Sequence, residues 1–310
     1  MRRSKVLATA AGIVVIALAA GMSALSRGGP PASIAPPPVA PAVHVVRQPH
    51  GAIALARQDG DRVVALSLQH AGAGVEARVT VLGPAGGGVA GLAVALDGGV
   101  RAKACGGGCY RVRLRHAGRA VVVHVHAPGE RTASIAFALP RAWPVGAGSE
   151  LAGVQRTLRG AGAVVYRERL SSAPGHAITT LWRAIAPDRL AYSADNGTQG
   201  IVIGDHRWDR DTSGGPWLRS PQDRLVLPAL PWSAHVQNVV RLDPPQGHRS
   251  TVVRFALFDP ATPAWYEVSA DARSHRLRSV HMTAASHFMR DDYLSYGSAP
   301  PIRPPIRGAT

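Results

Sequence analysis

Lysine is almost absent from this 310-residue chain, which contains only Lys5 and Lys103. Charged residues of all kinds make up 17% of the sequence, yet 35 Lys and Arg residues face 19 Asp and Glu residues, so the formal net charge is +16 and arginine carries nearly all of it. The positive charge is spread along the whole chain, whereas nucleic-acid-binding proteins usually concentrate it in one helix or stripe. We therefore predict no nucleic-acid partner.

Motifs of the common enzyme classes are also missing. The sequence has no G-x-S-x-G nucleophile motif, no H-E-x-x-H motif and no G-x-x-x-x-G-K phosphate loop. Asp205, Asp209 and Asp211 lie near His206, but they are interleaved with arginines, a pattern typical of the solvent face of a hairpin. We predict that the protein is not an enzyme.

The start of the chain lacks acidic residues and contains a long uncharged run. A basic cluster over residues 1–5 is followed by no further charge until Arg27. This run is longer than the apolar part of a secretory signal, about 7–15 residues, and long enough to span a bilayer. We predict an uncleaved signal-anchor or transmembrane helix over residues 1–27, with cleavage near Ala17–Ala19 as the alternative.

The basic cluster also predicts the orientation of such an anchor, because basic flanks stay in the cytoplasm. We therefore predict a single-pass protein of the cell membrane, with the bulk of the chain extracytoplasmic. No cysteine lies at the end of the apolar run, which excludes a lipid-modified N-terminal cysteine. Residues 28–43 are rich in proline and predict a stiff, extended linker.

Cysteine occurs only twice, as Cys105 and Cys109, with three glycines between them. Glycines allow a turn tight enough to bring the two Cα atoms within disulfide distance. An extracytoplasmic location would favour oxidation of the pair. We predict a local disulfide, and the alternative is a thiolate pair that binds Cu(I), because soft thiolates favour this ion.

Residues 44–142 show no helical period and consist of short apolar runs separated by turn residues. The runs include Ala52–Ala56, Arg62–Leu68, Val75–Leu82 and Ala120–His126. Such spacing is typical of strands. About seven strands in roughly a hundred residues predict an antiparallel β-sandwich domain.

The segment Val75–Leu96, followed by Cys109–Val112 and Arg119–His126, resembles a small extracytoplasmic β-sandwich found in bacterial copper-handling proteins of the CopC/CopD type and in YtkA/FixH-like modules. The resemblance implies a sandwich associated with copper or with a protein partner. His124 and His126 flank one residue of an expected strand, so both side chains leave the same face and could bind one metal ion. The alternative is a pair of surface histidines.

Residues 149–310 begin with an amphipathic pattern and continue as alternating runs. Apolar residues recur at helical spacing after Ser149, which can cap a helix, so we predict a helix over 149–159. The runs that follow are typical of antiparallel strands. The chain as a whole is therefore expected to be mainly β, with few helices.

This second region contains APDRL at 186–190, IVIGDHRWDR at 201–210, PW at 216–217 and IRPP at 302–305. Together these segments resemble the LolA-like fold, a group that includes lipoprotein carriers and the lipid-binding proteins LppX and LprG. The resemblance implies an α+β curved antiparallel half-barrel, with helices over its concave face and an apolar cavity for acyl chains.

Most of the tryptophans also lie in this region. Indoles on strands usually pack in a core, but the same residues would line a curved sheet that encloses an apolar ligand. Both interpretations stay open. The candidates for lining such a cavity are Trp182, Trp208, Trp217, Trp232 and Trp265.

Two methionines, Met282 and Met289, lie in one stretch with His281 and His287. On a single extended strand His281, His287 and Met289 would share a face, and Met282 would point to the other. Imidazole and thioether suit copper, so His281, His287 and Met289 form a candidate copper site. The two histidines would lie about 20 Å apart on a regular strand, so one ion would require a bend. The alternative is a core methionine with surface histidines.

These expectations describe an extracytoplasmic binding protein, anchored to the membrane, that holds an apolar, lipid-like ligand or a partner such as a membrane protein. One alternative is an accessory protein of copper handling and copper tolerance, with copper as its cofactor. Another is a structural or sensory module whose half-barrel is filled by its own side chains.

Anchoring by residues 1–27 can be tested by fractionation. The protein is expected to remain with the membranes through an alkaline carbonate wash, because an apolar helix of this length stays inserted in the bilayer. A soluble mature protein that begins near Gly21 would contradict this prediction.

Overall fold

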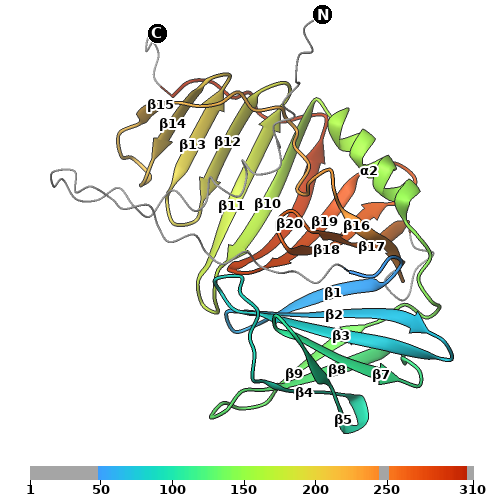
Figure 1. Ribbon diagram of the computed structural model, residues 1–310. Helices are drawn as coiled ribbons and strands as arrows, with labels where there is room; N and C mark the ends of the chain where they lie inside the picture. The colour runs from blue at the N-terminus through green and yellow to red at the C-terminus, as the bar shows by residue number, and fades with distance from the viewer. Residues whose placement is uncertain (1–47, 244–250, 306–310) are drawn as a thin grey trace, which may run out of the picture.

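The computed structural model describes residues 48–243 and 251–305, which fold into three antiparallel sheets (Figure 1). Helical structure within these ranges is limited to helix α2 (Gly148–Arg159) and the short 3₁₀ turn Asp97–Gly99. The prediction of a mainly β, antiparallel fold with few helices is confirmed. The predicted anchor over 1–27 and linker over 28–43 lie outside the described residues. Within the described ranges, no helix has the length and apolar character needed to cross a membrane.

Two of the sheets pack face to face as a β-sandwich. One has the strand order β1-β2-β3-β7-β6 and the other the order β5-β4-β8-β9. Their strands are β1 (Ile53–Asp59), β2 (Arg62–Ala71), β3 (Gly74–Leu82), β4 (Ala93–Leu96), β5 (Val100–Arg101), β6 (Lys103–Gly106), β7 (Cys109–Leu114), β8 (Ala120–His126) and β9 (Ala133–Ala138).

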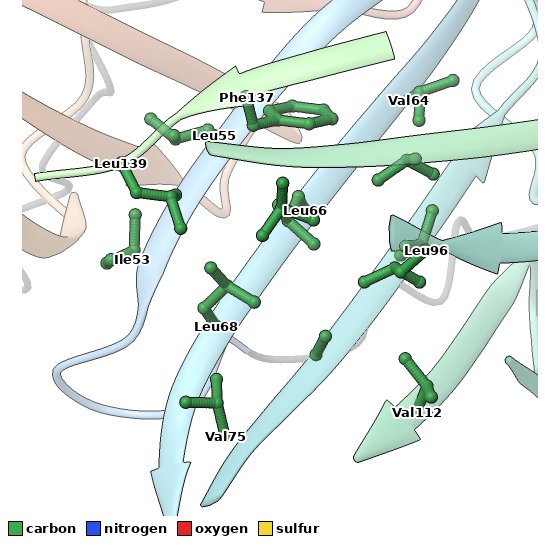
Figure 2. Packing of buried hydrophobic residues seen from close by; sticks show 14 of the residues in the cluster. Ile53, Leu55, Val64, Leu66, Leu68, Val75, Leu96, Val112, Phe137 and Leu139 are labelled. Carbon is green, nitrogen blue, oxygen red and sulfur yellow. The ribbon is translucent and has the colours of Figure 1, made fainter. Parts of the chain in front are cut away.

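Alternation along the strands produces the sandwich core. Val64, Leu66 and Leu68 follow one another at every second position of β2 and all point between the two sheets (Figure 2). Leu96 of β4 and Phe137 of β9 meet them from the opposite sheet, and all five side chains are buried. Successive side chains of a strand leave opposite faces, so the apolar runs read in the sequence become one inner face.

The predicted disulfide joins Cys105 of β6 to Cys109 of β7, with the two Cα atoms 5.1 Å apart. The three glycines between them all have positive φ angles, which L side chains rarely adopt. They form the tight turn that connects the two paired strands. In this oxidised form neither sulfur is a thiolate.

The third sheet has eleven strands in the order β15-β14-β13-β12-β11-β10-β20-β19-β18-β17-β16. Every pair of neighbours in it is antiparallel. Its strands are β10 (Ala163–Ser171), β11 (Ala177–Ile185), β12 (Arg189–Ala194), β13 (Gln199–Ile203), β14 (His206–Arg210), β15 (Leu218–Pro221), β16 (Gln237–Leu242), β17 (Val252–Asp259), β18 (Ala264–Asp271), β19 (Leu277–Ala284) and β20 (His287–Tyr296).

The connection between β15 and β16 must cross the whole of this sheet, because the two strands are its opposite edges. A flat sheet of eleven strands would be about 48 Å wide, and the connection Gln222–Val236, which we call the strap, could reach about 50 Å only if fully extended. The strap contains bends and turns, so it is shorter than that. The sheet must therefore curve, with the strap on its concave face, and Figure 1 shows a strongly twisted sheet.

Helix α2 covers another part of the concave face with Leu151, Val154 and Leu158, as the spacing predicted. The expected cap at Ser149 is wrong, because the helix begins one residue earlier and the Ser149 hydroxyl donates to Glu150 instead. The N-cap is the buried Ala147, whose N–H is donated to the carbonyl of Val239. Pairing of the entering chain with residues of β16 thus decides where the helix starts.

The convex face of the large sheet packs against the outer face of the sandwich. Ala54 and Ala56 of β1 and Ala65 of β2 point away from the sandwich core and contact a cluster that contains Phe258 and Trp265. All of these side chains are buried. Small residues allow the two sheets to approach closely, so the sheet of β1 and β2 is buried on both faces.

This tight contact predicts the effect of a larger side chain. Ala65→Leu is expected to lower the free energy of unfolding by about 1–3 kcal/mol, because extra methylenes in a filled interface force neighbouring side chains from their rotamers. The matched control Ala136→Leu, at an exposed position of β9, is expected to change it little. Urea unfolding of both variants measures the difference, and equal midpoints would show that the interface is loosely packed.

Candidate functional site

Four aromatic side chains form a row across the concave face of the large sheet. Tyr192, Trp182, Tyr166 and Tyr293 are consecutive cross-strand partners on β12, β11, β10 and β20. Neighbouring ring centroids are 4.9, 6.1 and 5.3 Å apart along the row. Tyr296 follows, 6.0 Å from Tyr293. We call these five residues the aromatic row.

The far end of the aromatic row depends on a glycine. Gly200 of β13 is paired with Tyr192, and a Cβ at this position would lie 2.2 Å from the tyrosine ring. The missing side chain lets the ring cross β13 so that its hydroxyl donates to Asp209 Oδ1 at 2.9 Å. Arg207 donates to the other oxygen of Asp209. Burial, and then the carboxylate of Asp209, raise the pKa of Tyr192 to about 12.

Two acidic residues lie next to the aromatic row on the same face. Glu168 of β10 and Asp291 of β20 are direct cross-strand partners, and only 7% and 3% of their surfaces are exposed. None of the ion pairs within the described residues involves either carboxyl group. Asp291 Oδ1 is buried without a hydrogen-bond partner. We call Glu168 and Asp291 the carboxylate pair.

Arginines flank the carboxylate pair in the sequence but do not neutralise it. Arg167 and Arg169 precede and follow Glu168, and Arg290 precedes Asp291. Successive residues of a strand leave opposite faces, so these arginines point to the convex side. There Arg290 donates to Asp292, the other neighbour of Asp291.

The surroundings of the carboxylate pair favour its protonated form. Burial raises the pKa of Glu168 to about 7. The indole N–H of Trp182, a hydrogen-bond donor near the carboxylate, lowers this pKa by a smaller amount. Burial, together with the charges of Glu168 and Asp292, raises the pKa of Asp291 well above its usual range. Two carboxyl groups this close cannot both ionise easily, so the pair retains a proton near neutral pH.

The structure does not bring the five candidate tryptophans together. Trp182 and Trp232 belong to the core cluster on the concave face. Trp265 lies at the contact with the sandwich. Trp208 is buried on the other side of β14, where Arg219 lies over its ring, and Trp217 lies beyond β14, with Arg210 over it.

The candidate copper residues do not form one continuous strand. The chain turns at Ala285–Ser286, and β19 and β20 pair as a hairpin in which Met282 is opposite Met289 and His281 is opposite Arg290. Cross-strand partners share a face, so His287 and Met289 share theirs with Met282, and His281 points to the other. The expected grouping of His281 with His287 and Met289 on one face is therefore wrong, because the turn reverses the alternation.

His124 and His126 of β8 leave one face, as expected, because Val123 and Val125, which alternate with them, point into the sandwich core. His124 Nδ1 lies 2.9 Å from Ser134 Oγ, and His126 Nδ1 lies 3.4 Å from Thr132 Oγ1. Within the described ranges no three or more His, Cys, Asp or Glu side chains are grouped so that they could hold a metal ion.

A cavity lies between β1 and the convex face of the large sheet. Its volume is about 330 Å³, and Trp265, His281, Arg57 and Glu267 are among its lining residues. Arg57 and Glu267 form an ion pair inside it. A second cavity of about 170 Å³ is lined by Met282 and His287 beside the turn of the β19–β20 hairpin.

Comparison with known proteins adds no relative to these observations: no protein-family model matches the chain, and no curated protein matches it. The function must therefore be argued from the geometry.

Sequence reasoning found Trp182 but missed the carboxylate pair and the tyrosines of the aromatic row. A signal for them does exist in the stretch Tyr166–Leu170, where Tyr166, Glu168 and Leu170 alternate with arginines. Alternation of this kind places Glu168 on the apolar face of its strand. Its pairing with Asp291, more than a hundred residues away, could not be read from the sequence.

The raised pKa of Glu168 predicts how stability depends on pH. Its carboxyl group binds a proton more tightly in the folded than in the unfolded protein, so this contribution to stability is present below about pH 4.5 and is lost as the pH rises through 7. Glu168→Gln is therefore expected to raise the urea midpoint at pH 8 more than at pH 5. Asp292→Asn, on the opposite face of β20, serves as the control. A Glu168→Gln variant with the same pH profile as the parent would contradict the prediction.

Proposed function

We propose that this protein is a membrane-anchored, extracytoplasmic binding protein that holds an apolar, lipid-like ligand against the concave face of its eleven-stranded sheet. The observation that carries the proposal is the composition of that face. Apolar and aromatic side chains cover most of it, and helix α2 and the strap lie over them instead of a second sheet. The resemblance to LolA-like carriers supports the same kind of ligand.

The strap is the part of this cover that a ligand could replace. Its ends are held by polar contacts, with Arg224 bound to Asp188 at one end and Ser233 bound to Asp259 at the other. Between these ends, Leu225, Leu227 and Leu230 pack on the sheet through apolar side chains. Two polar contacts are made there: the N–H of Leu227 is donated to Pro187, and the hydroxyl of Tyr266 donates to the carbonyl of Pro231. An acyl chain could take the place of the leucines at the cost of little hydrogen bonding.

The concave face also has an apolar end at the surface. Ile178 of β11 is 40% exposed, and it is paired with Leu170 of β10, which is in turn paired with Met289 of β20. Both of these are partly exposed. This row lies beside the carboxylate pair, so an apolar chain could enter here and reach the aromatic row. Copper handling and a module filled by its own side chains remain the alternative hypotheses.

Strand β11 offers a matched test of the proposal. Ile178 faces the concave side, and Leu181 on the same strand faces the convex side with nearly equal exposure, 40% against 41%. Ile178→Gln is expected to weaken the binding of a neutral single-chain amphiphile, such as dodecyl maltoside below its micelle concentration, by about tenfold, which corresponds to about 1.4 kcal/mol. Leu181→Gln is expected to change it less than twofold.

Binding can be followed by tryptophan fluorescence, because Trp182 lies on the concave face two strand partners from Tyr293. Equal weakening by the two variants would show that the amphiphile binds elsewhere. No binding to the parent protein would favour the filled module.

A further inference from the structure

The carboxylate pair has no basic partner among the described residues. Burying two carboxyl groups among aromatic and apolar side chains is costly unless hydrogen bonds or opposite charges compensate. Arginine is abundant in this chain, yet Arg167, Arg169 and Arg290 all leave the other face of the sheet. One oxygen of a pair held in this way, Asp291 Oδ1, has hydrogen-bonding capacity that no group of the described residues uses.

A buried oxygen without a hydrogen-bond partner lies at this place. It is Asp291 Oδ1, and Asp291 is more than nine-tenths buried. The indole N–H of Trp182, by contrast, lies close enough to Glu168 to lower the pKa of that carboxyl group. An unpartnered acceptor calls for an explanation in a folded protein, and a ligand that donates a hydrogen bond to it is one.

The aromatic row indicates that the ligand carries a positive charge. The faces of tyrosine and tryptophan attract cations, and a carboxylate does so by its charge. Tyr166 and Tyr293 keep part of their surface exposed, while burial raises the pKa of both well above the usual range.

A metal ion fits these residues poorly. Hard cations such as Ca²⁺ take about six to eight oxygen ligands, and no third acidic, histidine or cysteine side chain joins the carboxylate pair within the described ranges. An organic ammonium group, by contrast, uses carboxylate oxygens and aromatic faces together.

We propose that the carboxylate pair and the aromatic row bind the ammonium head of the ligand, so that the protein selects cationic amphiphiles. This inference rests on the proposed function, because the apolar part of the same ligand would occupy the leucine positions of the strap. Glu168 and Asp291 contact the positive charge, and Tyr166 and Tyr293 present their faces to it. The alkyl chain extends along the paired residues Met289, Leu170 and Ile178.

Binding of a cation must compete with the proton that the pair retains. The groups that face the pair are Tyr166 on β10, Tyr293 on β20 and Tyr266 on β18, and Asp292 acts on Asp291 from the convex side. The tyrosines keep their protons well beyond neutral pH, so among the groups that face it the carboxylate pair is the one whose charge changes between pH 5.5 and 8.5. Affinity for the cation should therefore rise with pH over this interval, and affinity for a neutral amphiphile should not.

The experiment compares dodecylammonium, whose N–H groups can donate to Asp291 Oδ1, with dodecyl maltoside, which has the same alkyl chain and no charge, each below its micelle concentration and titrated into the whole protein. We expect the parent to bind the cation at least tenfold more tightly than the neutral amphiphile at pH 8.5, with a smaller preference at pH 5.5. General electrostatic attraction cannot produce this preference, because the formal net charge of the protein is +16.

The variants separate this inference from the proposed function. Glu168→Gln combined with Asp291→Asn removes buried charge without changing side-chain shape, so the variant should fold, and it is expected to lose the preference for the cation while still binding the neutral amphiphile. Asp292→Asn should keep the preference. If the parent binds both amphiphiles equally, or if the double variant keeps the preference, the inference fails and the proposed function stands. If neither amphiphile binds, both fail.

Discussion

The close contact between the outer face of the sandwich and the convex face of the large sheet is the constraint on which the rest of the structure depends. It exists because β1 and β2 carry alanines at the positions that point away from their own core, where Phe258 and Trp265 reach them. Beyond the part of the convex face that is covered in this way, strand β10 is exposed to solvent on that side. Arginines of this strand, Arg167 and Arg169, occupy that open face.

The division of polar and apolar residues between the two faces then shapes the candidate site. Arginines on the convex side keep β10 and β20 soluble there, so the acidic residues that alternate with them are directed to the concave side. Glu168 and Asp291 meet in this way beside Tyr166, without a basic partner. The strap closes over the same face because the chain has no shorter route from β15 to β16. Site and cover are thus both consequences of sheet topology.

Much of the fold could be predicted from the sequence, since it depends on local alternation. The runs Arg62–Leu68 and Val75–Leu82 correspond to β2 and β3, whose bounds differ from them by at most three residues. The glycines between Cys105 and Cys109 made the disulfide predictable. Where the prediction was wrong, a contact distant in sequence or an unrecognised turn decided the outcome. The turn at Ala285–Ser286 separated His281 from the face of His287 and Met289.

By itself, the sequence determined which residues alternate, where helix α2 runs and which cysteines join, because each of these depends on neighbours within a few positions. Only the tertiary structure decided that Glu168 lies beside Asp291 and that Tyr166 lies between Trp182 and Tyr293. Those pairings join strands that are far apart in the chain. The register between such strands depends on the burial of whole faces and on loop geometry, and no short stretch of sequence contains that information.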